Sequence, residues 1–369
     1  MMDESLESPN RKAMVAMSGG VDSSVAAFLM KEHGFDCCGV TMKLFRNEDV
    51  GLPREKACCS LTDAEDARSV AEQLGIPFYV FNFADDFKTD VMERFIAAYQ
   101  NGTTPNPCID CNRYIKFGKL FRRAREFDYE ILATGHYSRI ERDAGSGRML
   151  LKKSLDPAKD QSYVLYAMTQ DQLARTVFPL GGLQKARVRE IAAEYGFSSA
   201  AKRDSQDICF VPSGDYARFI EQSLGRTWPE GDVTDKSGKK LGRHRGIIHY
   251  TVGQRKGLGL AMQKPYYVCA KCAETNTIIL GEESDLNCKA LEAGEINLIA
   301  CGSLPSPRRV RAKVRYRTAE QTAVVEQTAE DRFRVEFDEP QRGVAPGQAV
   351  VLYDGEIVLG GGTILRTVS

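Results

Sequence analysis

The sequence predicts an α/β domain with a parallel sheet, followed by a small central domain and a C-terminal β-barrel. Two observations lead to this fold class. Over roughly the first 200 residues, apolar strand-like runs alternate with helix-like stretches, which is typical of a parallel sheet with helical crossovers. After about residue 206, short alternating segments punctuated by glycine replace them, as in antiparallel β structure. We therefore expect domains at 1–205, 206–285 and 286–369.

The α/β domain repeats a strand followed by a helix. A turn at Gly19 and Gly20 separates the first strand from the first helix, and Thr62 with Glu65 has the spacing of a capping box before the second helix. Ligands of such sheets bind at the carboxyl ends of the strands, where these two glycines, Met42 and the turn at 134–136 would lie. The expected strands are 12–17, 35–45, 77–83 and 129–136, and the expected helices end near Gly34 and Gly75 or span about 86–100 and 112–127.

Composition restricts the class of protein. The chain has 369 residues, of which 43% are hydrophobic, and equal numbers of basic and acidic residues, 50 of each. A nucleic-acid partner must therefore be bound by local patches of positive charge. No apolar run approaches the ~20 residues of a membrane span, and the amino terminus lacks the apolar core of a signal peptide. We expect a cytoplasmic protein with no membrane partner, whose 11 cysteines are free thiols, metal ligands or catalytic sulfurs.

The loop SGGVDSS, at residues 18–24, joins the first strand to the first helix. Backbone N–H groups and the positive end of a helix dipole converge at such a turn and favour phosphate. Ser18 and Ser23 add hydroxyl donors, and Asp22 could help to hold magnesium through water. The lysine that closes a Walker A loop is absent, which favours release of whole pyrophosphate over γ-phosphate transfer. An ordinary glycine turn is the alternative.

This loop resembles the PP-loop of the ATP pyrophosphatases, which adenylate a carbonyl or carboxylate oxygen. Within that adenine nucleotide α-hydrolase-like group, the chain resembles the tRNA 2-thiouridylases, which use ATP and a persulfide sulfur to convert the wobble uridine of certain tRNAs to 2-thiouridine. The similar segments follow one order along nearly the whole chain: TPNPCIDCNRYIKFG (104–118), ATGHY (133–137), KDQSYVLY (159–166), DSQDICF (204–210), HYTVGQRKGLG (249–259) and PGQAVVLY (346–353). The ATP-binding residues that follow from this reading are Ala16, Met17, Ser18, Gly19, Gly20, Val21, Asp22, Ser23, Met42 and Gly135.

Thiolation of a uracil explains a need for two cysteines. The C2 carbonyl is a poor electrophile, and adenylation turns its oxygen into part of a leaving group, AMP. A cysteine persulfide is a suitable sulfur carrier, and a second thiol frees the terminal sulfur by exchange. The resemblance implies Cys209 as the persulfide carrier and Cys111 as the nucleophile.

The charges near these cysteines act in opposite directions. Acidic neighbours raise a thiol pKa and basic neighbours lower it, and the sequence leaves the balance open. The acidic neighbours are Asp110 and Asp207, and the basic neighbours are Lys116, Lys202 and Arg203.

Cys108 forms a CxxC pair with Cys111, where some members of the family carry an aspartate. Three interpretations stay open: an internal redox couple, an auxiliary nucleophile, or two ligands that hold a four-iron four-sulfur cluster together with Cys209. The CAKC segment at 269–272, with Cys288 and Cys301, lacks the spacing of a zinc ribbon. We expect packing roles for these cysteines and for Cys37, Cys38, Cys58 and Cys59.

As a strand, RVRAKVRYR, at 309–317, would bury one face and present a row of basic side chains on the other. Composition alone favours the solubilising outer face of a barrel, whereas the resemblance to the tRNA 2-thiouridylases favours RNA binding. The resemblance implies tRNA contacts by Arg315 and Tyr316, and a base extracted from its stack would border Asn106, Pro107 and Cys108. We interpret His136 as a contact and not as a catalyst. Further implied tRNA contacts are Lys159, Asp160, Gln161 and Gln348.

The expected partners are tRNA and a persulfide sulfur donor, either a cysteine desulfurase or a relay protein, and not DNA. Two other functions remain as alternatives. Another PP-loop enzyme, such as a tRNA cytidine-lysine ligase or an enzyme that amidates a small acid, would need no paired cysteines. A nucleotide-binding or tRNA-binding module without catalysis would release no pyrophosphate.

Overall fold

The computed structural model describes residues 11–51, 59–202, 208–260 and 264–368. The amino-terminal part is built on a five-stranded sheet in the order β3-β2-β1-β4-β7, in which every pairing is parallel. This confirms the predicted α/β class. Its strands are β1 (Lys12–Ala16), β2 (Asp36–Lys43), β3 (Phe78–Asn82), β4 (Ile131–Thr134) and β7 (Thr176–Val177).

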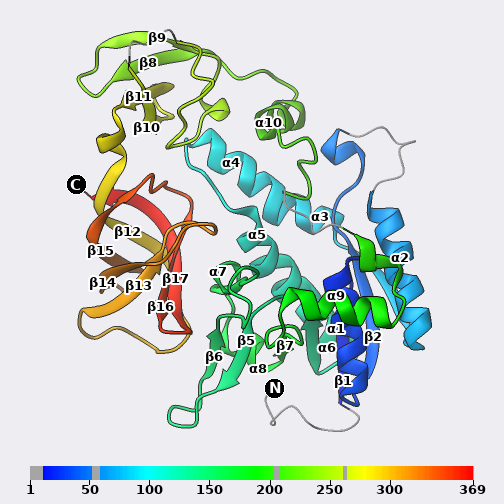
Figure 1. Cartoon of the computed structure of the whole chain (residues 1–369). Coiled ribbons are helices and arrows are strands. Elements are labelled where there is room, and N and C mark those ends of the chain that lie inside the picture. The colour runs from blue at the N-terminus through cyan, green and yellow to red at the C-terminus, as the bar shows by residue number, and fades with distance from the viewer. Residues whose placement is uncertain (1–10, 52–58, 203–207, 261–263, 369) are drawn as a thin grey trace.

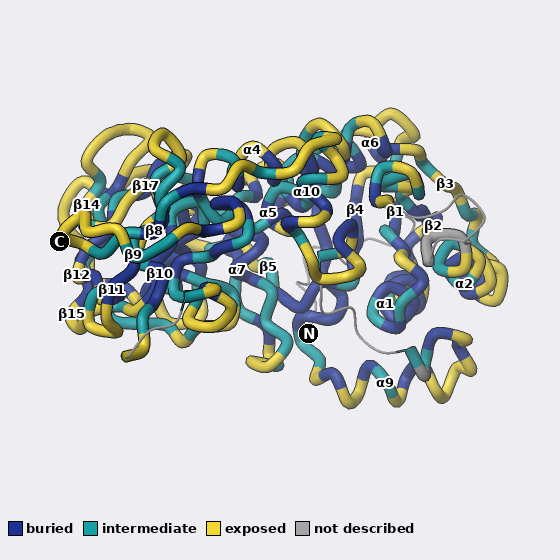
Figure 2. Tube along the Cα trace, turned by 90° about the horizontal axis from the view of Figure 1, so that it is seen from above, coloured by how far each residue is buried: buried dark blue, intermediate teal, exposed yellow. Residues whose placement is uncertain are grey.

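Helices cover both faces of this sheet because its strands are apolar on both sides (Figure 1). Ala13 and Val15 of β1 pack with α1 (Val21–Glu32), α2 (Cys59–Leu74) and α9 (Lys185–Glu194), whereas Met14 joins the core on the other face. Alternation along a strand sends neighbouring side chains to opposite faces. Figure 2 shows α1 buried along most of its length, as expected of a helix between a sheet and two other helices.

The direction of the connections reverses between β1 and β4. From β1 the chain proceeds to β2 and β3 on one side, and β4 and β7 lie on the other. The crevice beyond the carboxyl ends of the strands at such a switch point is the usual ligand site of an open α/β sheet. The loop at 18–24 follows β1 at this point.

The predicted capping box is wrong. Helix α2 begins at Cys59, so Thr62 and Glu65 lie within the helix and not at its start. The two residues have the required spacing, but the apolar pattern of the sequence did not reveal the extra turn that precedes them.

Two later helices contain π-helical segments, which are rare and often occur at functional sites. The first combines α3 (Ala84–Phe87), η3 (Lys88–Glu93) and α4 (Arg94–Gln100). The second combines α5 (Pro107–Asp110), η4 (Cys111–Leu120) and α6 (Phe121–Glu126). It begins at Pro107, earlier than the predicted residue 112, because Asn106 caps it and proline suits its first position.

The central part differs from the expected antiparallel structure in two ways. It contains a helix, α10 (Tyr216–Leu224), and β8 pairs in parallel with β11 within the sheet β10-β11-β8-β9. The strands are β8 (Gly231–Asp235), β9 (Lys240–His244), β10 (Tyr267–Cys272) and β11 (Thr277–Gly281). Short 3₁₀ helices lie at Glu48–Val50, Ser198–Ala201, Ile247–His249 and Glu283–Leu286.

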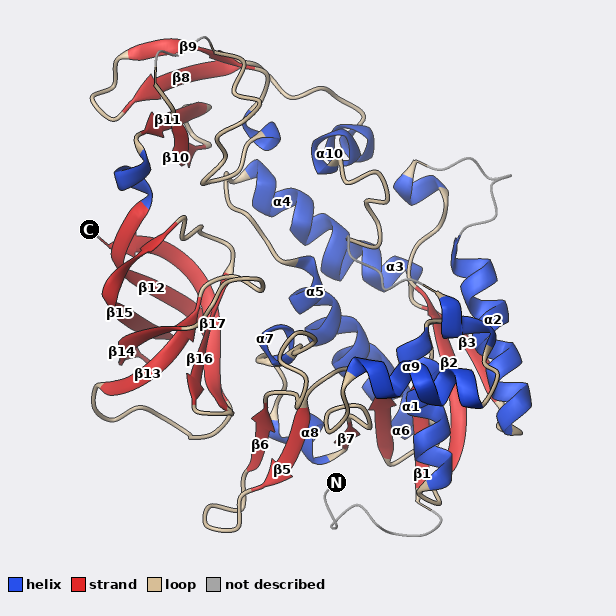
Figure 3. Cartoon of the chain, in the orientation of Figure 1, coloured by secondary structure: helices blue, strands red, loops and turns tan. Residues whose placement is uncertain are grey.

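The carboxyl-terminal strands form a closed barrel, as predicted, because β12 pairs with both β15 and β17 (Figure 3). A hairpin of the α/β domain, β5 (Arg139–Arg142) and β6 (Met149–Lys152), extends this sheet through the pair Lys152 and Ile357. The barrel strands are β12 (Asn287–Leu298), β13 (Arg308–Lys313), β14 (Gln321–Ala329), β15 (Arg332–Arg342), β16 (Ala349–Asp354) and β17 (Ile357–Val368). The domain boundaries at 205/206 and 285/286 stay predictions.

Two short helices connect the hairpin to the last strand of the parallel sheet. These are α7 (Ser162–Leu165) and α8 (Gln170–Ala174). Among the described residues, no helix is both long and apolar enough to cross a membrane.

Candidate active site

The loop after β1 is shaped as a phosphate cradle. Gly19 has a φ of +72°, and a Cβ there would lie 2.2 Å from the carbonyl oxygen of Asp63, so only glycine fits. The Ser23 hydroxyl accepts a hydrogen bond from the Ser18 N–H at 3.0 Å and donates to the Gly20 carbonyl at 3.0 Å. No side chain caps α1 at Gly20. The amino-terminal N–H groups of α1 are therefore oriented for an anion.

The ends of the neighbouring strands β4 and β2 lie beside this loop. Gly135 follows β4, and a Cβ there would meet the carbonyl carbon of Asp22 and the nitrogen of Ser23 at 2.9 Å. Met42 lies at the end of β2, half-buried against the core. The structure thus brings together the residues predicted from three strand ends, and their binding of ATP stays a prediction.

A lysine from a distant helix supplies a positive charge at the loop. The Lys185 ammonium, from the first turn of α9, donates to both carboxylate oxygens of Asp22 at 2.7 and 2.8 Å. The Tyr137 hydroxyl donates to Asp22 as well, at 2.7 Å. Lys185 is not recognisable from the sequence, because only the fold brings α9 to the loop.

Cys108 and Cys111 lie at the start of the helix that begins at Pro107. The Asn106 side chain accepts a hydrogen bond from the Cys108 N–H at 3.2 Å. Cys108 is exposed and Cys111 is half-buried. Asn112, which is buried, donates to the Val164 carbonyl at 3.0 Å and ties this helix to α7.

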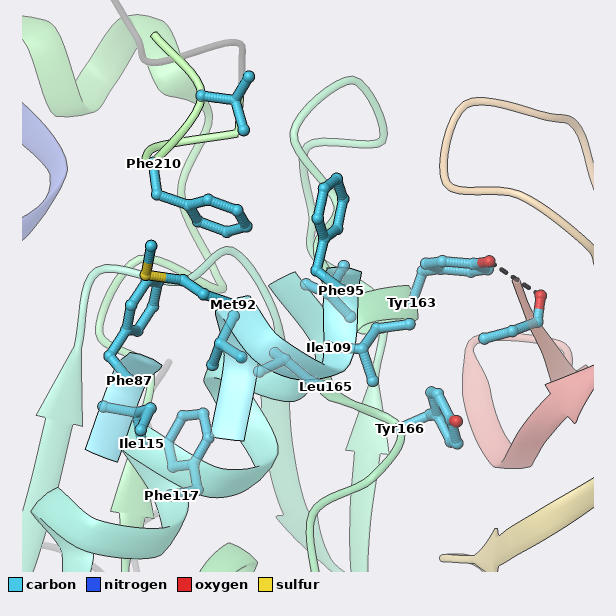
Figure 4. Close-up of a cluster of buried hydrophobic side chains, with 14 of the residues drawn as sticks. Phe87, Met92, Phe95, Ile109, Ile115, Phe117, Tyr163, Leu165, Tyr166 and Phe210 are labelled. Atoms are coloured by element: carbon cyan, nitrogen blue, oxygen red, sulfur yellow. Dashed lines mark hydrogen bonds between the residues drawn. The ribbon is translucent and has the colours of Figure 1, made fainter. Parts of the chain in front are cut away.

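Cys209 lies on a segment that Phe210 anchors in the core. The Phe210 ring lies 5.6 Å from Phe87 and 5.3 Å from both Phe95 and Phe219, measured between ring centroids (Figure 4). Cys209 itself is exposed. The buried phenylalanine therefore fixes the chain beside a cysteine that stays accessible.

The three thiols of Cys108, Cys111 and Cys209 lie near enough to influence one another's pKa values. Burial raises the pKa of Cys111 to about 11, and Cys108 raises it further. Cys108 and Cys209 keep exposed surface, but the protein packed around their sulfur atoms removes water from them. This loss of solvation raises the pKa of Cys209 to about 12, with further contributions from Cys111 and Cys108, and it also raises the pKa of Cys108. The raised pKa values favour the thiol over the thiolate for all three cysteines.

The charged side chains near the three thiols change the thiol pKa values less than burial does. Asp110 raises the pKa of Cys111, and Lys116 lowers the pKa of each of the three thiols. Lys202 instead pairs with Asp63 and Asp66. Asp207 and Arg203 lie outside the described residues.

The cysteines do not form a ready metal site. Within the described ranges, no group of three or more His, Cys, Asp or Glu side chains is arranged to hold a metal ion. The four-iron four-sulfur cluster on Cys108, Cys111 and Cys209 stays an open interpretation, and we derive no step through it.

His136 is buried and lies beside Lys116. Its Nε2 lies 3.4 Å from the Lys116 ammonium and its Nδ1 lies 2.7 Å from the Thr134 hydroxyl. Burial and the Lys116 charge hold the pKa of His136 well below its usual value. The imidazole is therefore neutral, and its burial argues against direct contact with tRNA in this conformation.

The C-terminal barrel forms hydrogen bonds to the loop that leads to Cys108. The Gln348 amide donates to the carbonyls of Thr104 and Pro105 at 2.9 and 3.2 Å, and the Thr104 N–H donates to the Pro346 carbonyl at 2.8 Å. The predicted role of Gln348 in binding tRNA would have to coexist with this contact or replace it.

Tyr316 and Arg315 also lie at this junction. The Tyr316 ring centroid is 6.0 Å from that of Tyr163, and the charges of Asp160 and Cys108 help to raise the Tyr316 pKa, after burial. The half-buried Arg315 guanidinium donates to the carbonyls of Val252 and Gly343. Their tRNA contacts stay predictions.

The strand that carries the predicted row of basic side chains is shorter than predicted, and its arginines form ion pairs with acidic residues. Strand β13 ends at Lys313, while Val310, Ala312 and Val314 are buried as expected. The arginines of the strand have acidic neighbours, since Arg308 pairs with Asp354, Arg309 with Asp338 and Arg311 with Glu320. An unpaired basic stripe is therefore not formed.

Side-chain hydrogen bonds hold the segment 159–161, which follows a turn at 157–159. The Asp160 carboxylate accepts from the Ser154 N–H at 3.0 Å and from the Ser162 hydroxyl at 2.8 Å. Gln161 accepts from the Tyr137 N–H at 2.9 Å. These bonds fix the backbone beside Lys159, and the tRNA contacts predicted for the three residues are not tested.

The remaining cysteines are spread over the fold. Cys37 and Cys38 are buried in β2, Cys288 is buried in β12, and Cys269, Cys272 and Cys301 are half-buried. Cys58 lies outside the described residues, as does the side chain of Cys59.

Family models match the chain in three consecutive stretches. Residues 11–213 match the tRNA methyl transferase HUP domain, residues 217–282 match the tRNA methyl transferase PRC-barrel domain, and residues 288–364 match the aminomethyltransferase beta-barrel domain. The first stretch alone covers more than half of the chain.

Curated relatives match over nearly the whole length. The tRNA-specific 2-thiouridylase MnmA of Clostridioides difficile (strain 630) is 49% identical over 358 residues, which are 97% of this chain and 99% of the relative. The protein of the same name in Moorella thermoacetica (strain ATCC 39073 / JCM 9320) is 51% identical over 351 residues, which are 95% of this chain and 98% of the relative. Among solved structures, NMN synthetase from Francisella tularensis is 17% identical and covers 60% of this chain and 79% of its own, with a TM-score of 0.33, which is too low to carry an argument.

Proposed function

Since the chain belongs to the tRNA-specific 2-thiouridylase family, we propose that it uses ATP to replace the C2 oxygen of the wobble uridine of tRNA by sulfur. The observation that carries this proposal is the gathering of Cys108, Cys111 and Cys209 on a fold that also forms a phosphate cradle at residues 18–23. Adenylation and sulfur transfer need these two sets of groups.

The first step uses the phosphate cradle. The C2 oxygen attacks the α-phosphorus of ATP, an O–P bond forms, pyrophosphate leaves, and the N3 proton of the base is released. The N–H groups at the start of α1 are placed to bind the phosphates, with Ser18 and Ser23 as further donors. Lys185 already forms an ion pair with the Asp22 carboxylate, so this carboxylate is not free to hold magnesium by itself. Magnesium would therefore enter bound to ATP, and we assign no step to the metal.

The second step uses the cysteines. The terminal sulfur of a persulfide on Cys209 attacks C2, loses its proton and forms a C–S bond, and AMP leaves with the C–O electron pair. The Cys111 thiolate then attacks the Cys209 sulfur. A disulfide forms between the two cysteines, the electron pair of the broken S–S bond passes to the sulfur on C2, and N3 regains a proton. A thiol reductant must then reduce the disulfide, and a persulfide donor must recharge Cys209.

The supply of sulfur and the place of action follow from this chemistry. We expect the donor to be a cysteine desulfurase or a relay protein that hands over a persulfide. Because tRNA and ATP meet in the cytoplasm, we expect the enzyme to act there.

Conversion of tRNA tests the function. With ATP, magnesium, tRNA and a persulfide donor, the protein should form 2-thiouridine together with equal amounts of AMP and pyrophosphate. Mass spectrometry of the tRNA nucleosides and a pyrophosphate assay measure both products. Pyrophosphate release with a different modified nucleoside would indicate another PP-loop enzyme, and no release would indicate a module without catalysis.

Lys185→Met should slow pyrophosphate release roughly a hundred- to a thousandfold, the order expected for removing one donor from a site where negative charge develops. We propose that ATP draws the Lys185 ammonium from Asp22 toward the phosphates, since both groups lie at the loop. Tyr137→Phe is the matched control, because it removes a hydrogen bond to Asp22 but no charge. Equal rates in the two variants would contradict the role of Lys185.

A further inference from the structure

Lys116 and Cys111 share one face of a π-helical segment. Both belong to η4 (Cys111–Leu120), in which hydrogen bonds join residues five positions apart. Residues five apart in such a helix lie towards the same side, and the Lys116 charge acts on the Cys111 thiol. In an α-helix, residues five apart would point in different directions.

His136 fixes the Lys116 ammonium from behind. An ammonium can only donate, so the His136 Nε2 at 3.4 Å must accept, and the ring proton lies on Nδ1, which is 2.7 Å from the Thr134 hydroxyl. The imidazole is held between Phe117 and Phe178, with ring centroids at 5.9 and 5.7 Å. Within the described part of the chain, no carboxylate forms an ion pair with Lys116.

The positive charge of Lys116 affects the pKa of all three thiols. Lys116 lowers the pKa of Cys108, Cys111 and Cys209, in each case against burial, which raises it. Sulfur must become an anion at two points of the proposed reaction, on Cys111 and on the persulfide of Cys209. A buried anion needs a fixed cation nearby.

We propose that Lys116 supplies the positive charge that stabilises the sulfur anions of the transfer step, and that His136 is a positioning residue that holds this charge in place. The inference rests on the proposed function for the identity of the step. Its structural basis is the register of the π-helix and the contact with a neutral histidine.

Alkylation of Cys111 by iodoacetamide, in the absence of tRNA and at a fixed pH of about 8, measures the thiolate directly. Lys116→Met should lower the alkylation rate about tenfold, the change that one pKa unit produces, and Lys116→Arg should restore most of it. Lys119→Met is the matched control on the same helix, because Lys119 pairs with Asp86 at 2.7 Å, and it should react like the unchanged protein. Peptide mass spectrometry separates Cys111 from the other cysteines.

A second measurement distinguishes the loss of the Lys116 charge from a general structural defect. In a single turnover with persulfide already loaded, Lys116→Met should slow formation of 2-thiouridine about tenfold while pyrophosphate release stays unchanged. Wild-type alkylation rates in Lys116→Met, or equal rates in Lys116→Met and Lys116→Arg, would overturn the inference. If alkylation depends on Lys116 but the unchanged protein makes no 2-thiouridine, the proposed function fails and the inference about the charge stands.

Discussion

Cys209→Ser should abolish the formation of 2-thiouridine from a persulfide donor, a fall of roughly a thousandfold or more, while pyrophosphate is still released as the tRNA is adenylated, with AMP staying on C2 until water displaces it. A serine hydroxyl cannot carry a persulfide, so the sulfur has no route to C2. The adenylating loop lies between β1 and α1, and its hydrogen bonds do not involve the segment anchored by Phe210. Nucleoside mass spectrometry beside a pyrophosphate assay shows the two effects separately.

The other cysteines provide the controls for this result. Cys272→Ser, in the central sheet, should leave both products unchanged, since Cys272 does not contribute to the pKa of any of the three clustered thiols. Cys111→Ser should instead trap tRNA on Cys209 through a C2–S–S bond that a thiol reductant releases. Full thiolation by Cys209→Ser would refute its role as the persulfide carrier.

Local patterns predicted the α/β architecture and the nucleotide loop. Strand-like runs and glycine turns are encoded by neighbouring residues, so β1, α1 and β2 lie close to where the sequence put them. The same local information placed the helix start at residue 112 instead of Pro107, because the cap at Asn106 was not recognised within a proline-rich stretch.

Groups that meet only through the fold were not predictable. Lys185 reaches Asp22 because α9 packs beside α1, and no spacing in the sequence encodes that contact. Lys116 was recognised as a nearby charge, but its alignment with Cys111 depends on a π-helix, which residue patterns do not reveal. Arg315 was predicted to face RNA from a strand, yet the strand ends at Lys313 and the chain turns its guanidinium into the protein.

Gly135→Ala should lower pyrophosphate release about a hundredfold, the cost of a displacement of roughly 1 Å in a reacting site. The added Cβ would lie 2.9 Å from the backbone of Asp22 and Ser23, and backbone atoms cannot rotate away as a flexible side chain can. The loop must therefore shift, and its N–H groups shift with it. Gly302→Ala is the control, because nothing lies within 4 Å of a Cβ there.

The alkylation rate of Cys111 shows whether Gly135→Ala displaces only the nucleotide loop or a larger part of the protein. Because the cysteine cluster is built on the helix from Pro107 and on the segment at Phe210, Gly135→Ala should leave the alkylation rate of Cys111 unchanged. Loss of adenylation with normal thiol reactivity means that the loop alone was displaced. Normal pyrophosphate release would show that the close approach of β4 to the loop is not needed for ATP use, and the assignment of Gly135 to the nucleotide site would then be wrong.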